Sequence, residues 1–595
     1  MTNTIESTTE PEPVDIAYLD PSLLVSARVE NLLGQMTLEE KASLFFQTMI
    51  TIGQNGELSE GDPGLGRIGT SELVLGLGLT HFNLLGDASS AAQMANWHDL
   101  LQELAASSRL GIPITLSTDP RHSFTDNPGT AMPAGPFSQW PEPIGLAAVG
   151  DEELVERFAD IARQEYTAVG LRVALHPQLD LATESRWARQ AATFGEDAEL
   201  TSRLGAAYIR GFQGSVLGAD SVATMTKHFP GGGPQKDGED PHFEYGREQV
   251  YPGDNFEYHL RPFEAAFEAG TSQIMPYYGM PVGTEYEEVG FGFNKSIIPG
   301  LLRERFHFDG VVCADWGLIN DSQIAGQPFP ARAWGVEDLS PRERMLKVVN
   351  AGVDQFGGES CPELLIDLVH SGEVSEERIN ASARRLLREK FRLGLFDAPY
   401  VDEQRAQAVV GSAEFRQAGE AAQRAAITVL TNDNLLPLKR GMRLYVEGID
   451  PVIAGEYGIV VDSPEQADAA VLRLQSPYEV RETVFENFFH AGSLEFANDV
   501  REHVSAVAAA VPTVVDVFLD RPAILEPIVA AAGAVVANFG ANPRALLDVL
   551  IGDAAPKGRL PFDVPRSMEA VRASRPDVPF DTTDPLFSFG HGLTL

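Results

Sequence analysis

The sequence predicts an α/β protein in two parts, a closed barrel of alternating strands and helices followed by a smaller open α/β sheet. The 595 residues exceed the ~250–300 residues at which a single core usually stops growing, so two domains are expected. Short apolar runs alternate with amphipathic stretches over the first 400 residues, and a shorter series follows. Such alternation predicts parallel sheets, and the long first series favours a closed barrel.

The individual elements follow from these runs. In the first series, strands are predicted at 79–86, 112–119, 171–182, 222–230, 272–279, 310–317 and 351–358. Helical patterns include 151–170, 197–214 and 375–397. In the second series, strands are predicted at 443–450, 469–474, 513–519 and 534–540, separated by alanine-rich helices. The boundaries that result are a flexible arm at 1–21, the barrel at 22–400, a linker at 401–417 and the second domain at 418–595.

The amino-acid composition restricts the classes of molecule that this protein can bind. The formal net charge is -40, which argues against binding to nucleic acid or to membrane surfaces and suits a small neutral ligand. Two cysteines are too few for a disulfide framework. The polar, acidic start has no signal-peptide pattern, and no apolar run approaches ~20 residues, so we expect a cytoplasmic protein. The oligomeric state stays open, and a homodimer is compatible with the sequence.

Polar side chains gather at the C-terminal ends of the predicted barrel strands. Asp119, the pair Lys227 and His228, Tyr278 and Asp315 all have this position. A solvated capping role would explain any one of them. Because the C-terminal rim of an α/β barrel carries its chemistry, their repetition predicts an active site there.

Several other chemistries lack their motifs. The sequence has no P-loop, no dinucleotide-binding glycine motif, no HExxH and no GxSxG elbow in a strand–helix context. In the loop 231–243, Asp237, Asp240 and His242 could ligate a cation, but solvated loop charges explain them better. We therefore expect neither a metal nor a cofactor.

Among the chemistries considered, carboxylate chemistry on a sugar is the one that the sequence still supports. Asp315 ends a strongly apolar strand, and the adjacent Trp316 offers a flat face on which a sugar ring can stack. Lys227, His228 and Arg189 supply hydrogen-bond donors for a polyol. Two carboxyl groups, one nucleophile and one acid, are the usual apparatus of glycoside hydrolysis.

A set of ordered motifs makes the chain resemble glycoside hydrolase family 3 over nearly its whole length. They are RLGIPITLSTD (109–119), RWARQAATFGED (186–197), TKHFPGGG (226–233), GVVCADWG (310–317), NAGVDQFGG (350–358), NDNLLPL (432–438), GRLPFDVP (558–565) and FSFGHGL (587–593). The resemblance implies a TIM-like (β/α)8 barrel followed by an α/β sandwich. It also implies a retaining β-glycosidase that acts on non-reducing ends.

The resemblance also implies roles for single residues. Asp315 matches the nucleophile and Trp316 the stacking residue. The substrate-binding residues that match are Asp119, Arg189, Lys227, His228 and Tyr278. The family pattern around Arg189 has a glycine and a glutamate where this chain has Ala188 and Ala192, so the usual ion pair beside Arg189 is not expected.

The sequence identifies the general acid less clearly than it identifies the nucleophile. In two-domain members it is a glutamate of the second domain, and Glu479, just after Pro477 and Tyr478, is the first choice, with Glu482 and Glu486 in reserve. In a competing scheme, an Asp–His pair on the loop after KHFPG supplies the acid, which here points to His242.

The resulting hypothesis is an exo-acting β-glucosidase on small oligosaccharides or β-glycosides. β-Xylosidase and β-N-acetylglucosaminidase are alternatives of the same class. A catalytically silent sugar-binding protein is the alternative of another class.

Overall fold

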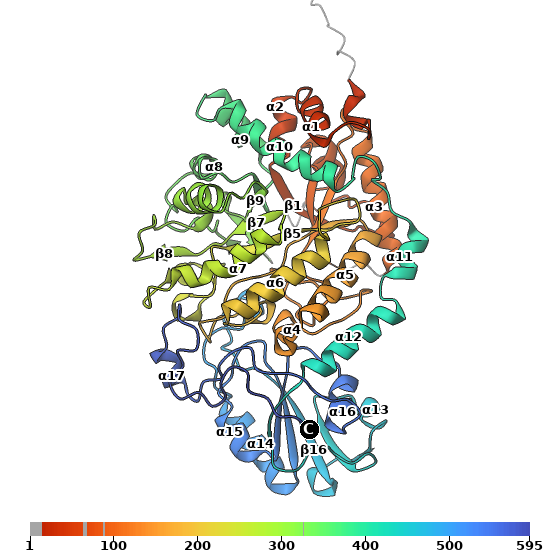
Figure 1. Ribbon diagram of the computed structural model, residues 1–595, viewed down its shortest axis with the longest axis vertical. Helices are drawn as coiled ribbons and strands as arrows, with labels where there is room; N and C mark the ends of the chain where they lie inside the picture. The colour runs from red at the N-terminus through yellow and green to blue at the C-terminus, as the bar shows by residue number, and fades with distance from the viewer. Residues whose placement is uncertain (1–14, 63–67, 87–89, 325–326) are drawn as a thin grey trace, which may run out of the picture.

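The computed structural model describes residues 15–62, 68–86, 90–324 and 327–595. It consists of a closed barrel and, below it in Figure 1, a second domain built around an open sheet. The predicted fold class is therefore confirmed. Among the described residues no helix has the length and apolar character needed to span a membrane.

The barrel has eight parallel strands in the order β1-β12-β9-β7-β5-β4-β3-β2. Their bounds are β1 Phe46–Thr51, β2 His81–Leu85, β3 Thr115–Thr118, β4 Leu171–Ala174, β5 Ala223–Phe229, β7 Gln273–Pro276, β9 Val311–Ala314 and β12 Gln355–Gly357. All seven predicted strands are present. The eighth, β1, closes the barrel by pairing with both β2 and β12.

The barrel helices are amphipathic and begin at clear caps. Asp151, Asp197 and Ser375 accept hydrogen bonds from the first turns of α5, α6 and α10, which confirms these three predicted helices. The bounds are α1 Val25–Leu33, α2 Leu38–Ser43, α3 Ala91–Ala106, α4 Pro143–Val149, α5 Glu152–Ala168, α6 Ala198–Gln213, α7 Phe256–Glu268, α8 Pro341–Asn350, α9 Pro362–His370 and α10 Glu376–Arg392. Two short sheets join β6 Glu248–Val250 to β8 Met280–Val282 and β10 Ser322–Ile324 to β11 Gln327–Phe329.

The second domain is a six-stranded sheet with an apolar cluster on each face. Its order is β13-β18-β17-β16-β14-β15, parallel throughout except that β13 runs antiparallel to β18. Alternate residues serve opposite faces: Val515 belongs to one cluster and Val514 to the other. The strands are β13 Thr428–Asn432, β14 Arg443–Glu447, β15 Ile459–Val460, β16 Ala469–Gln475, β17 Thr513–Phe518 and β18 Ala534–Asn538, and the helices are α13 Pro451–Ala454, α14 Asn498–Ala510, α15 Glu526–Ala531, α16 Pro543–Leu550 and α17 Met568–Ala573.

The predicted arm and linker have structure where the chain is described. Residues 1–14 of the arm lie outside the described residues, but Tyr18, in a short 3-10 helix, is buried and its hydroxyl donates to the Leu110 carbonyl (2.8 Å). The linker range holds α11 Glu403–Val409 and the start of α12 Ala413–Ala426. These helices run down one side of the molecule from the barrel to the second domain (Figure 1).

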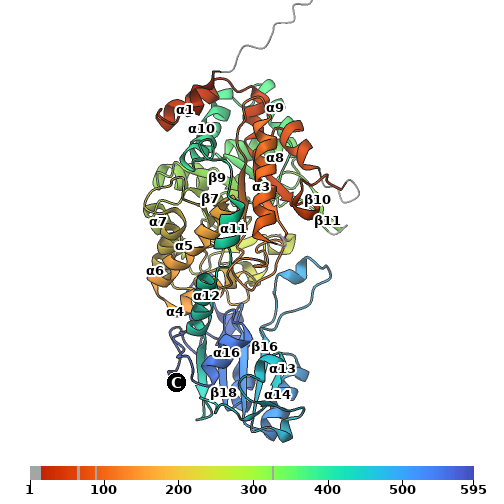
Figure 2. The same ribbon diagram turned by 90° about the vertical axis from the view of Figure 1, so that its right-hand side faces the viewer.

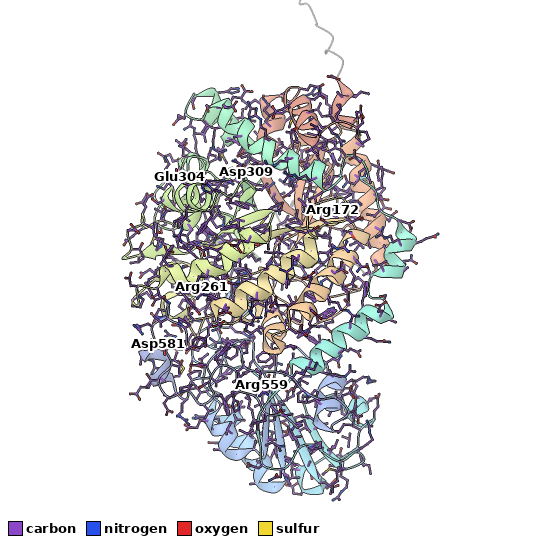
Figure 3. All side chains as sticks on the ribbon, in the orientation of Figure 1. Arg172, Arg261, Glu304, Asp309, Arg559 and Asp581 are labelled. Atoms are coloured by element: carbon purple, nitrogen blue, oxygen red, sulfur yellow. The ribbon has the colours of Figure 1, made fainter. Side chains whose placement is uncertain are left out.

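The C-terminal ends of the barrel strands face the second domain. In Figure 3, Arg172 and Asp309, which lie at the N-terminal ends of β4 and β9, are in the part of the barrel away from that domain. Ile144 and Ala148 of α4 belong to an apolar cluster of the second domain. The N–H of Arg559, labelled just below the barrel, donates to the Ala148 carbonyl (2.8 Å). The rim therefore opens onto a packed domain interface.

Candidate active site

Asp315 lies at the centre of a buried polar cluster on this rim. It follows β9 directly, and its Oδ1 accepts the Trp316 N–H (2.9 Å). Its Oδ2 has no hydrogen-bond partner within the described residues, and His228 Nε2 lies 4.0 Å away. Burial raises the pKa of Asp315, while nearby His242, Arg189 and Lys227 act in the opposite direction. The result is a carboxylate oxygen with a free lone pair among cationic groups and donors.

Asp119 and Lys227 form a second part of the cluster. Asp119 follows β3, and Lys227 lies near the end of β5. Lys227 Nζ is 3.5 Å from Asp119 Oδ1, and Asn83 of β2 donates to Asp119 Oδ2 (3.1 Å). All three residues are buried. The closed barrel thus brings an acceptor after β3 and a cation on β5 together, although β4 lies between these two strands in the sheet.

His228 is held in one tautomer. Arg189 Nη1 donates to His228 Nε2 (3.0 Å), so the ring proton must be on Nδ1, which donates to Asp180 Oδ2 (2.7 Å). Burial and the neighbouring Arg189 and Lys227 hold the pKa of His228 well below its usual value. His228 is therefore a neutral ring that orients the Arg189 guanidinium.

Tyr278 and Trp316 form the wall beside Asp315. The Tyr278 hydroxyl donates to the Trp316 carbonyl (2.8 Å) and lies beside the Asp315 carboxylate. The Trp316 ring lies over the Gly357–Gly358 backbone: a Cβ added at Gly357 would be 2.5 Å from Trp316 Cε3. The glycines of the FGG motif thus make room for the indole.

His242 comes next to Asp315 from the long loop after β5. Its Nδ1 is 2.6 Å from Asp240 Oδ1, and its ring packs on Tyr278 and Phe489, with centroid distances of 4.8 and 4.7 Å. Both His242 and Asp240 are buried, which corrects the expectation of solvated loop charges for these two residues. Since Asp240 occupies Nδ1, Nε2 is the nitrogen left for a substrate.

The loop of the second domain at 476–492 reaches the same rim, but its glutamates lie differently. The Glu479 side chain is 56 % exposed, and its carboxylate accepts the Ser493 N–H (3.1 Å). Glu482 is exposed, and Glu486 accepts from the Tyr245 hydroxyl (2.9 Å). Arg481 ties the loop to the barrel through Glu239 (2.8 Å). Figure 2 shows the loop extending from the second domain alongside the barrel.

The structure thus brings together seven of the eight predicted site residues on the barrel rim, with His242 beside them. It places Glu479 in the adjoining loop, bonded to that loop. Sequence reasoning missed Asn83 and Asp180 as members of the cluster, whereas it named Asp240 as a possible cation ligand and as the partner of His242 in the competing scheme for the acid. Asn83 and Asp180 each carry one signal, a polar residue inside an apolar run (HFNLL and LDLA) near a strand end.

The arrangement suits attack on a neutral, hydroxyl-rich substrate. Asp315 offers a nucleophilic oxygen, while Asp119, Lys227 and Arg189 supply an acceptor and donors for hydroxyl groups. Asp240 and His242 form a pair able to transfer a proton.

Comparisons with known proteins agree with this reading. The model of the "Glycosyl hydrolase family 3 N terminal domain" matches residues 74–389, and that of the "Glycosyl hydrolase family 3 C-terminal domain" matches residues 457–595. The first match covers the rim cluster and the second most of the other domain.

Individual relatives span almost the whole chain. "Probable beta-glucosidase C" of Aspergillus flavus is 52% identical over 97% of this chain and 92% of its own. The "Periplasmic beta-glucosidase/beta-xylosidase" of Dickeya chrysanthemi is 44% identical over 97% and 91%. Among solved structures, a β-glucosidase of Erythrobacter marinus has a TM-score of 0.79 at 21% identity and covers 97% of this chain and 84% of its own, a likeness of fold.

Proposed function

Because the chain belongs to glycosyl hydrolase family 3 and is therefore a glycoside hydrolase, we propose that it is a retaining, exo-acting β-glucosidase that forms a covalent glycosyl-enzyme on Asp315. The observation that carries the proposal is the unpartnered Oδ2 of Asp315 inside a buried clamp for hydroxyl groups. The names of the relatives support glucose as the sugar and, for the Dickeya protein, xylose as a second substrate.

The clamp would fix the terminal sugar with its anomeric carbon at Asp315. Asp119 accepts from hydroxyl groups, while Lys227 and Arg189 donate to them, and Trp316 offers an apolar face to the ring. Hydrogen bonds to charged groups contribute about 1.5–3 kcal/mol each, which is enough for a few such contacts to select one sugar.

His242 is the proton donor in this proposal, in preference to Glu479. Its support is the burial of His242, its contact with Tyr278 and the orientation of its ring by Asp240, whereas the Glu479 carboxylate is mostly exposed and already bonded to Ser493. A buried, oriented acid also avoids competition from solvent.

The reaction then has two steps. Asp315 Oδ2 attacks the anomeric carbon, the glycosidic C–O bond breaks, and protonated His242 gives its proton to the leaving oxygen. In the second step neutral His242 takes a proton from water, whose oxygen attacks the same carbon and releases Asp315. Two inversions restore the β configuration.

The test is a panel of 4-nitrophenyl β-glycosides: glucoside, xyloside and N-acetylglucosaminide. We expect fastest release of nitrophenol from the glucoside, slower release from the xyloside, and β-glucose as the first product by NMR. If no glycoside releases nitrophenol, a catalytically silent sugar-binding protein becomes the better interpretation. If the N-acetylglucosaminide releases nitrophenol fastest, N-acetylglucosamine replaces glucose as the sugar of the substrate. The cytoplasmic location and the homodimer stay predictions.

A further inference from the structure

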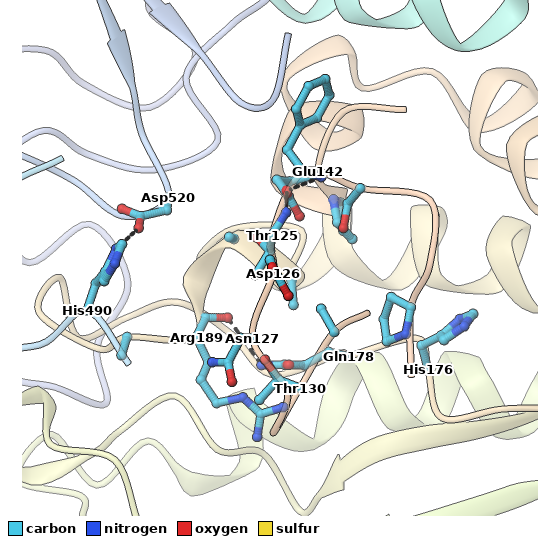
Figure 4. Close-up of a pocket in the computed structure, with 18 of the residues that line it drawn as sticks. Thr125, Asp126, Asn127, Thr130, Glu142, His176, Gln178, Arg189, His490 and Asp520 are labelled. Carbon is cyan, nitrogen blue, oxygen red and sulfur yellow. Dashed lines mark hydrogen bonds and ion pairs between the residues drawn. The ribbon is translucent and has the colours of Figure 1, made fainter. Parts of the chain in front are cut away.

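A cavity of about 270 Å³ lies between the barrel and the second domain, next to the proposed catalytic cluster. Figure 4 shows its two walls: Thr125 and Gln178 are on the barrel side, and His490 and Asp520 come from the second domain. Arg189 and Lys227 line the cavity as well as the cluster around Asp315, but Asp315 is not among the lining residues. The cavity is therefore a side pocket behind the clamp and is separate from the position of bond cleavage.

Short side chains keep this pocket open. Ala188, Ala191 and Ala192, on the loop that carries Arg189, all line it. Ala192 is only half-buried although the residues on either side of it are buried, and it is one of the residues that line the space. Larger apolar surfaces border the pocket, contributed by Phe124, Phe194, Tyr208, Phe488 and Phe518. A branched side chain at position 192 would occupy the space that the alanine leaves.

Two of the residues that line the pocket carry buried acceptor atoms without donors among the described residues. Gln178 is 2 % exposed, and its Oε1 has no hydrogen-bond partner in the described part of the chain. Its Nε2 points the other way, toward the Arg189 carbonyl (3.4 Å), which fixes the orientation of the amide. Asp520 Oδ1 is likewise unpartnered among the described residues, while its Oδ2 bonds to His490 Nδ1. Since buried polar atoms normally have partners, these acceptors leave hydrogen-bonding capacity that O–H or N–H groups of a ligand can satisfy.

The charges of the lining favour a neutral ligand. Arg189 and Lys227 already face carboxylates of the catalytic cluster. Glu142 accepts two backbone N–H groups of the 124–125 turn, and burial raises its pKa to about 7. Free acceptors repel an anion, and the apolar rings suit the C–H face of a sugar. The volume lies just below the ~300–1,000 Å³ of most ligand pockets, so one sugar ring fits better than an oligosaccharide.

We propose that this pocket is a second sugar subsite, which holds a monosaccharide unit linked to the terminal sugar on the side away from its anomeric carbon. This inference rests on the proposed function, because it takes the anomeric carbon to lie at Asp315. A ring so placed meets Arg189 and Lys227 with its other hydroxyl groups, and the pocket begins behind those two residues. The enzyme would then accept a terminal sugar that carries a branch and release the two sugars together as an intact disaccharide.

The test compares 4-nitrophenyl β-glucoside with 4-nitrophenyl β-glucosides that carry one xylosyl or glucosyl unit at O2, O3, O4 or O6. For at least one branched substrate, we expect nitrophenol and the intact disaccharide as the products of one hydrolysis. Ala192→Leu should lower kcat/KM for that substrate at least 10-fold and leave the plain glucoside within about 2-fold. Ala192→Ser, which keeps the pocket open, is the matched control and should behave like the wild type. Gln178→Met should also lower kcat/KM selectively for the branched substrate, by about 10-fold.

A second arm identifies the source of the bound sugar. Crystals soaked separately with the branched disaccharide and with free glucose or xylose should show a ring bonded to Gln178 Oε1 and Asp520. A ring seen only with free monosaccharide would support a sugar site but assign it to the product. Water only in every soak, with no intact disaccharide released, would overturn the inference. So would an equal fall for both substrates in Ala192→Leu. If the wild type still hydrolyses the plain glucoside, only the second subsite is rejected and the proposed function holds. If the wild type does not hydrolyse the plain glucoside, the proposed function itself is rejected.

Discussion

The barrel rim and the 476–492 loop of the second domain face each other but hold their polar residues in different ways. On the rim, Asp119, Lys227 and Asp315 are buried. Asp119 is bonded to Lys227 and to Asn83 of the adjacent strand β2, and Asp315 accepts the N–H of the next residue, Trp316. On the loop, Glu479 and Glu482 are exposed, and Glu479 bonds within its own segment.

This difference shows which polar side chains are held in place by the barrel strands and which depend on a loop. Parallel strands in register bring their C-terminal residues to one rim whatever the connecting loops do. A loop residue depends on contacts made by its own segment, as Arg481 does with Glu239. We therefore expect rim substitutions to cost activity and loop substitutions to cost mainly loop order.

The largest effect is expected for Asp315→Asn, which keeps the shape of the side chain and removes the proposed nucleophile. The kcat for 4-nitrophenyl β-glucoside should fall by roughly 10⁴-fold or more, the scale on which removal of a catalytic nucleophile acts. Unchanged circular dichroism would show that the fold is intact. Activity near the wild-type level would remove Asp315 from the mechanism.

The next test sets the rim against the loop directly. His242→Ala should lower kcat/KM for cellobiose by roughly 10²–10⁴-fold, the range of general acid catalysis, and Glu479→Ala by less than about 10-fold. Azide should restore turnover of the nitrophenyl glucoside in the histidine variant and yield a β-glucosyl azide. The reverse order of effects, with rescue of Glu479→Ala alone, would transfer the acid to the loop.

A smaller effect is expected in the pH profile of Lys227→Met. In the proposed mechanism Asp315 attacks as the carboxylate, and Lys227 partly offsets the rise in the pKa of Asp315 caused by burial. Without the cation the pKa of Asp315 rises further, so the acidic limb of kcat/KM should move to higher pH. Lys236→Met, an exposed lysine paired with Glu248, is the control and should leave the limb in place. An acidic limb that does not move in Lys227→Met would contradict the proposed coupling.

The smallest effect concerns the joint between the two regions. Glu196 of the barrel accepts N–H groups of Asp563 and Phe580 in the second domain, and burial raises its pKa to about 8, against ~4.3 in an unfolded chain. The folded state therefore holds an extra proton, and its stability should fall as pH rises from about 4 to 8. Glu196→Gln should show a smaller decline of the thermal midpoint between pH 5 and 8. Equal declines in the two proteins would show that Glu196 does not titrate in this window.

The sequence was sufficient for most of the barrel and much of the site. Predicted strand ends identified Asp119, Lys227 and Asp315 because an apolar run that stops at a polar residue marks both the strand and its exit. Strand β1 was missed because Gln47 and Thr48 interrupt its apolar pattern and only two residues separate it from α2. Asp180 was missed because its role depends on His228, 48 residues away in the chain.

Position 192 shows a different limit of sequence reasoning. An alanine gives no positive signal of function, and the pocket that it borders exists only once the second domain is in place. The distance between Glu479 and the rim depends in the same way on how the two domains pack.

Helix α4 has a consequence for engineering by recombination. Since Ile144 and Ala148 complete an apolar cluster of the second domain, the natural cut at the α11–α12 junction would separate that domain from part of its own core. Chimaeras that exchange the second domain should carry residues 143–149 from the same parent, because the unit of exchange is discontinuous in the chain.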